Sequence, residues 1–90
     1  MPEITVTPSR VKHSEVLYVL GKGFTPNRMA ISHLLRPDGS EYNVLRLRID
    51  AGGEFSHKID TTMLTTGTFA VWVEDEPTKK VTKRLQFVVE

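Results

Sequence analysis

Apolar residues recur at every second position of this chain, in short runs that turn residues separate. The stretch 45–49, Leu-Arg-Leu-Arg-Ile, has the alternation of a strand whose sheet has one wet face. The runs are rich in β-branched and aromatic residues, and no window shows the three- and four-residue spacing of a long helix. We expect only one short helical turn, around Met63 and Leu64.

The alternation predicts seven strands at intervals of about 8–12 residues, which is the spacing typical of a β-sandwich. Pro37, Asp38 and Gly39 form the clearest turn, because proline presets φ and glycine accepts a positive φ. The predicted strands cover residues 3–7, 15–20, 29–35, 42–49, 55–59, 69–74 and 81–89. We therefore predict a single all-β domain over residues 1–90.

Composition narrows the classes of partner. Twelve basic and 11 acidic residues give a net charge of +1, without the basic excess of nucleic-acid-binding or membrane-surface domains. No stretch approaches the ~20 apolar residues that span a bilayer, and the N-terminus lacks the apolar run of a signal peptide. The absence of cysteine excludes disulfides and thiolate chemistry. We expect no nucleic-acid partner and no membrane insertion.

Four motifs, in order along nearly the whole chain, resemble those of bacterial and archaeal immunoglobulin-like domains. They are Gly21-Lys22-Gly23-Phe24-Thr25-Pro26-Asn27, Pro37-Asp38-Gly39, Asp50-x-x-Gly53-x-Phe55 and Gly67-x-Phe69-x-Val71-x-Val73-x-Asp75. The resemblance implies a seven-stranded antiparallel immunoglobulin-like β-sandwich of the type without a disulfide, found in surface, secreted and phage-virion proteins. The inter-sheet cysteines and third-strand tryptophan of the antibody type are absent. The resemblance implies a fold and not a site.

No catalytic group of residues is visible in the sequence. His13, His33 and His57 are far apart and form no metal-binding or base motif. His33 and His57 alternate with apolar residues, so we expect both to be partly buried. No serine sits in a G-x-S-x-G elbow, and the glycines at 21 and 23 lack the rest of a phosphate-binding loop. We predict that the chain is not an enzyme and binds no cofactor.

Two charged segments have alternative interpretations. The acids at 74–76, with Asn27 and Asp38 from other loops, are oxygen donors of the kind that calcium prefers. They lack the D-x-D-x-D spacing, and acidic residues are ordinary in exposed turns, so we predict no metal site. The basic run at 79–84 is expected to be solvated edge charge that opposes aggregation between sheets. An anionic partner is the alternative.

Trp72 is the candidate for partner binding. Phe69, Val71 and Val73 take the inward positions of its strand, so we expect Trp72 to face outward, and tryptophan is enriched in binding hot spots. The candidate binding face consists of Trp72, Arg84, Gln86, Leu34 and Ser32. Such a face suits a sugar ring or a protein. The alternatives are that Lys or Arg stems cover the ring, or that the face assignment is off by one.

Together these features predict a non-catalytic structural or interaction module. We expect it to mediate adhesion or protein contacts on a cell surface or a virion, with neighbouring domains of a longer chain as further partners. The alternative function is a carbohydrate- or ligand-binding module that uses the face around Trp72.

Overall fold

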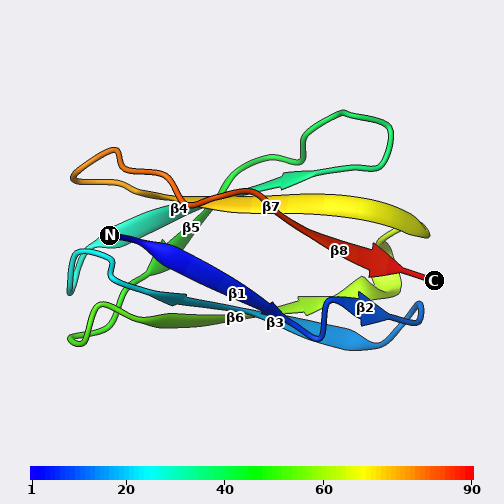
Figure 1. Cartoon of the computed structure of the whole chain (residues 1–90), viewed down its shortest axis with the longest axis horizontal. Coiled ribbons are helices and arrows are strands. Elements are labelled where there is room, and N and C mark those ends of the chain that lie inside the picture. The colour runs from blue at the N-terminus through cyan, green and yellow to red at the C-terminus, as the bar shows by residue number, and fades with distance from the viewer.

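The computed structural model describes residues 1–90, and its regular structure consists of strands apart from one 3-10 turn (Figure 1). The elements are β1 (Glu3–Thr7), β2 (Arg10–Val11), β3 (Val16–Lys22), β4 (Met29–Leu35), β5 (Leu45–Arg48), β6 (Phe55–Asp60), η1 (Thr61–Met63), β7 (Gly67–Asp75) and β8 (Leu85–Val89). The all-β prediction is confirmed. No helix has both the length and the apolar character needed to cross a membrane.

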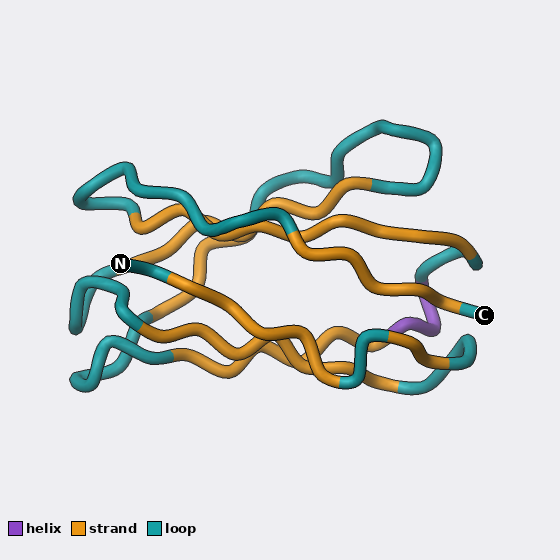
Figure 2. Tube along the Cα trace, in the orientation of Figure 1, coloured by secondary structure: helices purple, strands orange, loops and turns teal.

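The strands form two sheets that lie face to face as two layers (Figure 1). One sheet has three strands in the order β1-β3-β6, and the other has five in the order β2-β8-β7-β4-β5. Neighbouring strands are antiparallel except for the short β2–β8 pair, which is parallel. Most loops gather at the two ends of the layers (Figure 2).

The structure has one strand more than the seven that we predicted, because residues 10–11 pair although they are too few to show a periodicity. β1 pairs with β3 in the smaller sheet. That ladder ends at Pro8, because proline has no backbone N–H to donate. Two residues later the chain forms β2, which pairs with β8 of the larger sheet.

The last strand was predicted to cover residues 81–89, but its regular pairing with β7 begins only at Leu85. Val81 bridges Glu74 while Leu85 pairs with Val71, so four steps on one strand lie opposite three on the other. An extra residue of this kind is a β-bulge, which reverses the alternation of faces beyond it. The Thr82 hydroxyl fills the gap in the ladder by accepting a hydrogen bond of 3.0 Å from the Val73 backbone nitrogen.

The core lies between the inner faces of the two sheets. Phe69 and Phe87 stack with their ring centroids 5.2 Å apart at its centre. Phe55 lies across Gly21, where a Cβ atom would overlap its ring, and Phe24 packs edge-on against Phe55 at 5.3 Å. Phe24, Phe55 and Phe69, the phenylalanines of the sequence motifs, are therefore parts of the core.

Asp75 connects the loop between β3 and β4 to the β7–β8 hairpin. Its carboxylate accepts hydrogen bonds from the backbone nitrogen (3.1 Å) and hydroxyl (2.6 Å) of Thr25 and from the hydroxyl of Thr78 (2.7 Å). Burial by itself raises the pKa of Asp75, but these hydrogen bonds outweigh burial, and the pKa lies below its ordinary value of 3.8. One carboxylate thus joins two motif segments that are 50 residues apart.

Replacing Asp75 by Asn should lower the free energy of unfolding by about 1–3 kcal/mol near pH 7, because charge-assisted hydrogen bonds are lost. Asp75 has a lower pKa in the folded than in the unfolded chain, so its ionised form stabilises the fold above the unfolded pKa. That stabilisation is lost as the pH falls through the folded pKa. Urea titrations should therefore show a smaller difference between wild type and Asp75→Asn at about pH 3 than at about pH 7.

Asp38→Asn is the matched control, because the Asp38 carboxylate hydrogen-bonds only within its own exposed turn, to Ser40. It should cost less stability than Asp75→Asn near pH 7. An equal loss from the two variants would contradict the role given to Asp75.

Candidate functional site

Trp72 lies on the outer face of the five-stranded sheet, but its residue is only 7% exposed. Its ring stacks in parallel on His33 of the neighbouring strand β4, with the centroids 5.2 Å apart. From the β8 side, the guanidinium of Arg84 lies 3.8 Å from the ring centroid. Trp72 thus faces outward, but it is not exposed, because an aromatic stack and a cation–π contact cover the ring; this is the alternative in which an Arg side chain lies over it.

Ser32 and Leu34 do not share a face with Trp72, contrary to our expectation. Residues directly opposite in an antiparallel ladder point to the same side, and these two lie opposite the inward-facing valines of β7. Both point between the sheets, and His33 takes the place beside Trp72. The face assignment on β4 was off by one because this strand carries apolar residues on both sides, so alternation does not determine its orientation.

The other members of the predicted face do lie on the outer side of the sheet. Gln86 is exposed and lies opposite Ala70, one step along from Trp72. Arg84 belongs there as well, but it covers the tryptophan and leaves no open aromatic surface beside it. The structure thus brings together Trp72, Arg84 and Gln86, with His33 in place of Ser32 and Leu34.

The acids considered for calcium point to different partners. Asp75 is bound by Thr25, and Glu76 forms a bidentate pair with Arg46 at 2.9 and 3.1 Å. A Glu74 oxygen lies 4.0 Å from His33 Nε2. The loop with Asp38, between β4 and β5, is at the opposite end of the molecule from this hairpin (Figure 1). No three His, Asp or Glu side chains are grouped so that they could hold a metal ion.

Sequence reasoning missed the outer face of the three-stranded sheet. Val16, Tyr18 and Leu20 of its central strand β3 point outward in a row and are 37–40% exposed. The flanking outward residues are short or polar and leave this apolar stripe uncovered: Thr5 and Thr7 on β1, and Ser56 and Lys58 on β6. The available signal was the unbroken apolar run Val-Leu-Tyr-Val-Leu, which places apolar side chains on both faces of a strand.

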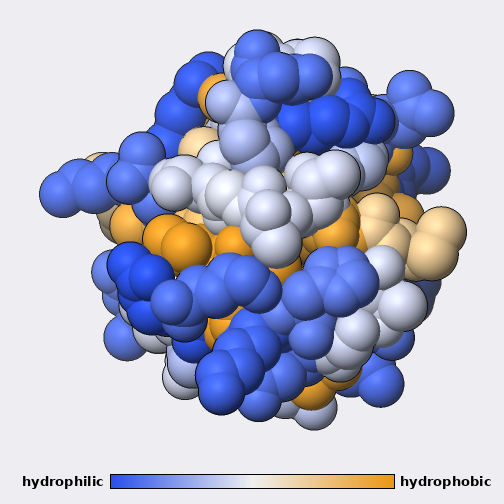
Figure 3. Space-filling model, turned by 90° about the vertical axis from the view of Figure 1, so that its right-hand side faces the viewer, coloured by the Kyte–Doolittle hydropathy of each residue, from blue (hydrophilic) through white to orange (hydrophobic).

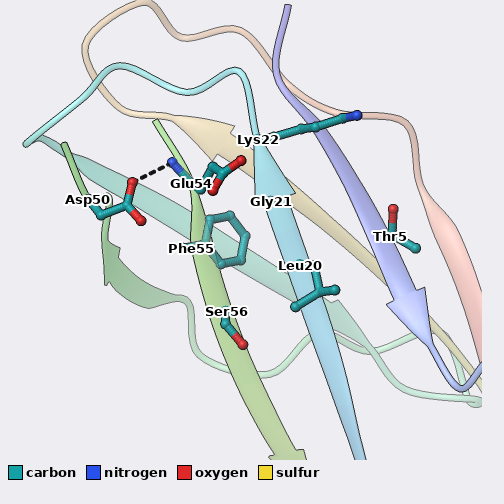
Figure 4. Close-up of a pocket in the computed structure, with 8 residues that line it drawn as sticks. All are labelled: Thr5, Leu20, Gly21, Lys22, Asp50, Glu54, Phe55 and Ser56. Carbon is teal, nitrogen blue, oxygen red and sulfur yellow. Dashed lines mark hydrogen bonds between the residues drawn. The ribbon is translucent and has the colours of Figure 1, made fainter. Parts of the chain in front are cut away.

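An open hollow of about 420 Å³ lies at one end of this face (Figure 4). Leu20 and Phe55 form its apolar part, and the charged side chains of Lys22, Asp50 and Glu54 also line it. One of these, Asp50, accepts hydrogen bonds of 2.9 Å from the backbone nitrogens of Gly52 and Glu54. Its carboxylate therefore holds the loop between β5 and β6 in place beside the hollow.

A second cavity, of about 350 Å³, lies between the layers where β5 and β6 are the edge strands. Its walls are mainly apolar and comprise Leu34, Tyr42, Leu45, Ile59, Leu64 and Val71. Ser32 and His57 also line it. Burial lowers the pKa of His57 below its ordinary value of 6.5, so its ring is neutral near pH 7. At the end of the molecule that carries the C-terminus, apolar residues form a band, with residues of intermediate hydropathy above it and polar residues below it (Figure 3).

Solved structures of low sequence identity share the fold of this chain. Macromomycin matches with a TM-score of 0.72 and 11% identity over 100% of both chains. CHIR-AB1 matches with a TM-score of 0.57 and 14% identity, over 100% of this chain and 98% of its own. A CARDB domain from Pyrococcus furiosus, solved in complex with di-metal ions, matches with a TM-score of 0.55 and 15% identity, over 100% and 86%.

No protein-family model and no curated protein matches the sequence. At the identities of the solved structures, the likeness establishes the fold alone. That fold is all-β with two packed sheets, and immunoglobulin-like domains are among its neighbours.

Replacing Arg84 by Ala should open one side of the Trp72 ring and cost about 0.5–1 kcal/mol of stability, the worth of an exposed cation–π contact. Trp72 is the only tryptophan, so acrylamide quenching of the intrinsic fluorescence reports on this ring alone. We expect stronger quenching in Arg84→Ala than in wild type. Lys83→Ala, one residue away, is the control, and equal quenching in the two variants would show that Arg84 does not cover the ring.

Proposed function

We propose that this chain is a non-catalytic, immunoglobulin-like interaction module that contacts a protein partner through the outer face of its three-stranded sheet. The observation that carries the proposal is the exposed stripe of Val16, Tyr18 and Leu20. Contiguous exposed apolar side chains mark interaction surfaces on soluble domains, and tyrosine is enriched at the centres of interfaces. The resemblance to surface and virion domains supports adhesion or assembly in those settings.

The geometry favours a protein over a carbohydrate as the partner. A sugar ring binds by stacking on an open aromatic face, and Trp72 has His33 and Arg84 against its ring. A sugar would have to displace Arg84 before it reached the tryptophan. Tyr18 is 40% exposed and lies between the aliphatic Val16 and Leu20 on its own strand, with threonines of β1 on one side and Lys58 of β6 on the other, a mixture of apolar and polar groups that suits a protein surface.

The positions of the histidines support a non-catalytic role. His13 contacts Ser14 in an exposed loop, His33 is stacked on Trp72, and His57 lines the cavity between the sheets. General acid–base chemistry needs a base within hydrogen-bond reach of a second reacting group. None of the three has a nucleophile and an acid placed beside it in that way.

The proposal is tested with a photo-crosslinking amino acid at position 18, expressed in the native cells. We expect discrete crosslinked products from position 18 and far fewer from Gln86, the matched exposed position on the outer face of the other sheet. Excess unlabelled wild-type protein should compete the products away, whereas excess Tyr18→Asp should not. Equal crosslinking from both positions, or equal competition by wild type and Tyr18→Asp, would contradict the proposed surface.

A further inference from the structure

The cavity between the sheets, which we call the inter-sheet cleft, contains polar groups without partners in the protein. Ser32 is 9% exposed, and its hydroxyl makes no hydrogen bond within the chain. No fully buried side-chain polar atom lacks a partner, so the Ser32 oxygen must be accessible, and the cleft is the space that it lines. His57, opposite Val19 on the inner face of β6, also lines the cleft with both ring nitrogens free.

The lining defines the kind of ligand that the inter-sheet cleft accepts. Its walls are mainly apolar, and Asn43 adds one neutral polar side chain to those of Ser32 and His57. The charged residues Lys58 and Asp60 alternate with the inward residues of β6, so their charges lie at the mouth. A neutral imidazole offers one donor and one acceptor, and the Ser32 hydroxyl offers both. An ionised ligand would lose its hydration here and find no opposite charge at the floor of the cleft.

The volume limits the size of the ligand. At about 350 Å³ the inter-sheet cleft is at the small end of the range of roughly 300–1,000 Å³ for ligand sites, which suits a molecule of about 10–15 non-hydrogen atoms. One ring with a short substituent fills that space. The apolar walls take the ring, and the polar groups of β4 and β6 meet the substituent.

We propose that the inter-sheet cleft binds a neutral, mainly apolar molecule with a single ring and one amide or hydroxyl group, which Ser32 and His57 hold by hydrogen bonds. This function is separate from the protein contact on the outer face of the three-stranded sheet. The cleft opens between the layers at β5 and β6, whereas that face is centred on β3.

Acetanilide is the probe, because it combines one aromatic ring with an amide that both donates and accepts. In protein with ¹³C-labelled methyl groups, we expect saturable shifts at Leu34, Leu45 and Leu64, with a Kd of roughly 1 mM or tighter, as fits a ligand this small. Phenylacetate has the same number of non-hydrogen atoms but carries a charge, and it should bind at least about tenfold more weakly because its desolvation is not compensated.

Ser32→Ala should weaken acetanilide binding about three- to tenfold through the lost hydrogen bond. Ser56→Ala is the matched control, since Ser56 is an exposed serine on the outer face of β6. Leu45→Trp places a large ring at the mouth of the cleft and should abolish binding. Leu45 is 47% exposed on an edge strand, so this variant should remain folded, which a thermal melt verifies.

Three results would overturn the proposal. The first is the absence of saturable shifts in the wild-type cleft at about 10 mM acetanilide, well above the affinity expected of so small a ligand. The second is binding that Ser32→Ala and Ser56→Ala weaken equally. The third is phenylacetate binding as tightly as acetanilide. Tyr18→Asp should leave acetanilide binding unchanged, which separates this proposal from the proposed protein contact.

Discussion

A sheet of three strands cannot cover a sheet of five, and this mismatch determines what the surface of the protein offers. The central strands are sealed: Leu17 and Val19 on β3, and Phe69 and Val71 on β7, are at most 1% exposed. At the β5 edge of the larger sheet, the smaller sheet no longer covers the inward-pointing side chains. Leu45 points inward from the edge strand β5 and is still 47% exposed. The inter-sheet cleft therefore follows from the number of strands in each layer.

The two outer faces differ in whether a neighbouring side chain lies over the aromatic residue: Trp72 is 7% exposed and Tyr18 is 40% exposed. On the larger sheet Arg84 reaches across to Trp72 and covers it, because a long stem carries the guanidinium over the ring. On the smaller sheet the neighbours of Tyr18 on one side are threonines of β1, which are too short to reach over it. Tryptophan is the more conspicuous residue in the sequence, but the tyrosine is the open one.

Local patterns predicted the all-β class and the main strands, and pairing between distant segments determined the rest. Alternation and turn residues located the main strands because both act within a few residues. The orientation of β4 depended on its partner β7, so Ser32 and Leu34 were assigned to the wrong face. The cleft was invisible in the sequence, because it exists only where the edge strands of two sheets meet. The Thr25–Asp75 contact spans 50 residues and has no local signal.

The most direct test of this arrangement is the titration of His57. The imidazole of this residue is half-buried and lines the opening between the sheets. The three histidines can be assigned by single His→Gln variants and followed by NMR from about pH 4 to about pH 8, around the ordinary histidine pKa. We predict a His57 midpoint below 6.5, because burial disfavours the protonated ring. A midpoint at or above 6.5 would contradict the account, since it would place the ring in open water or beside a carboxylate.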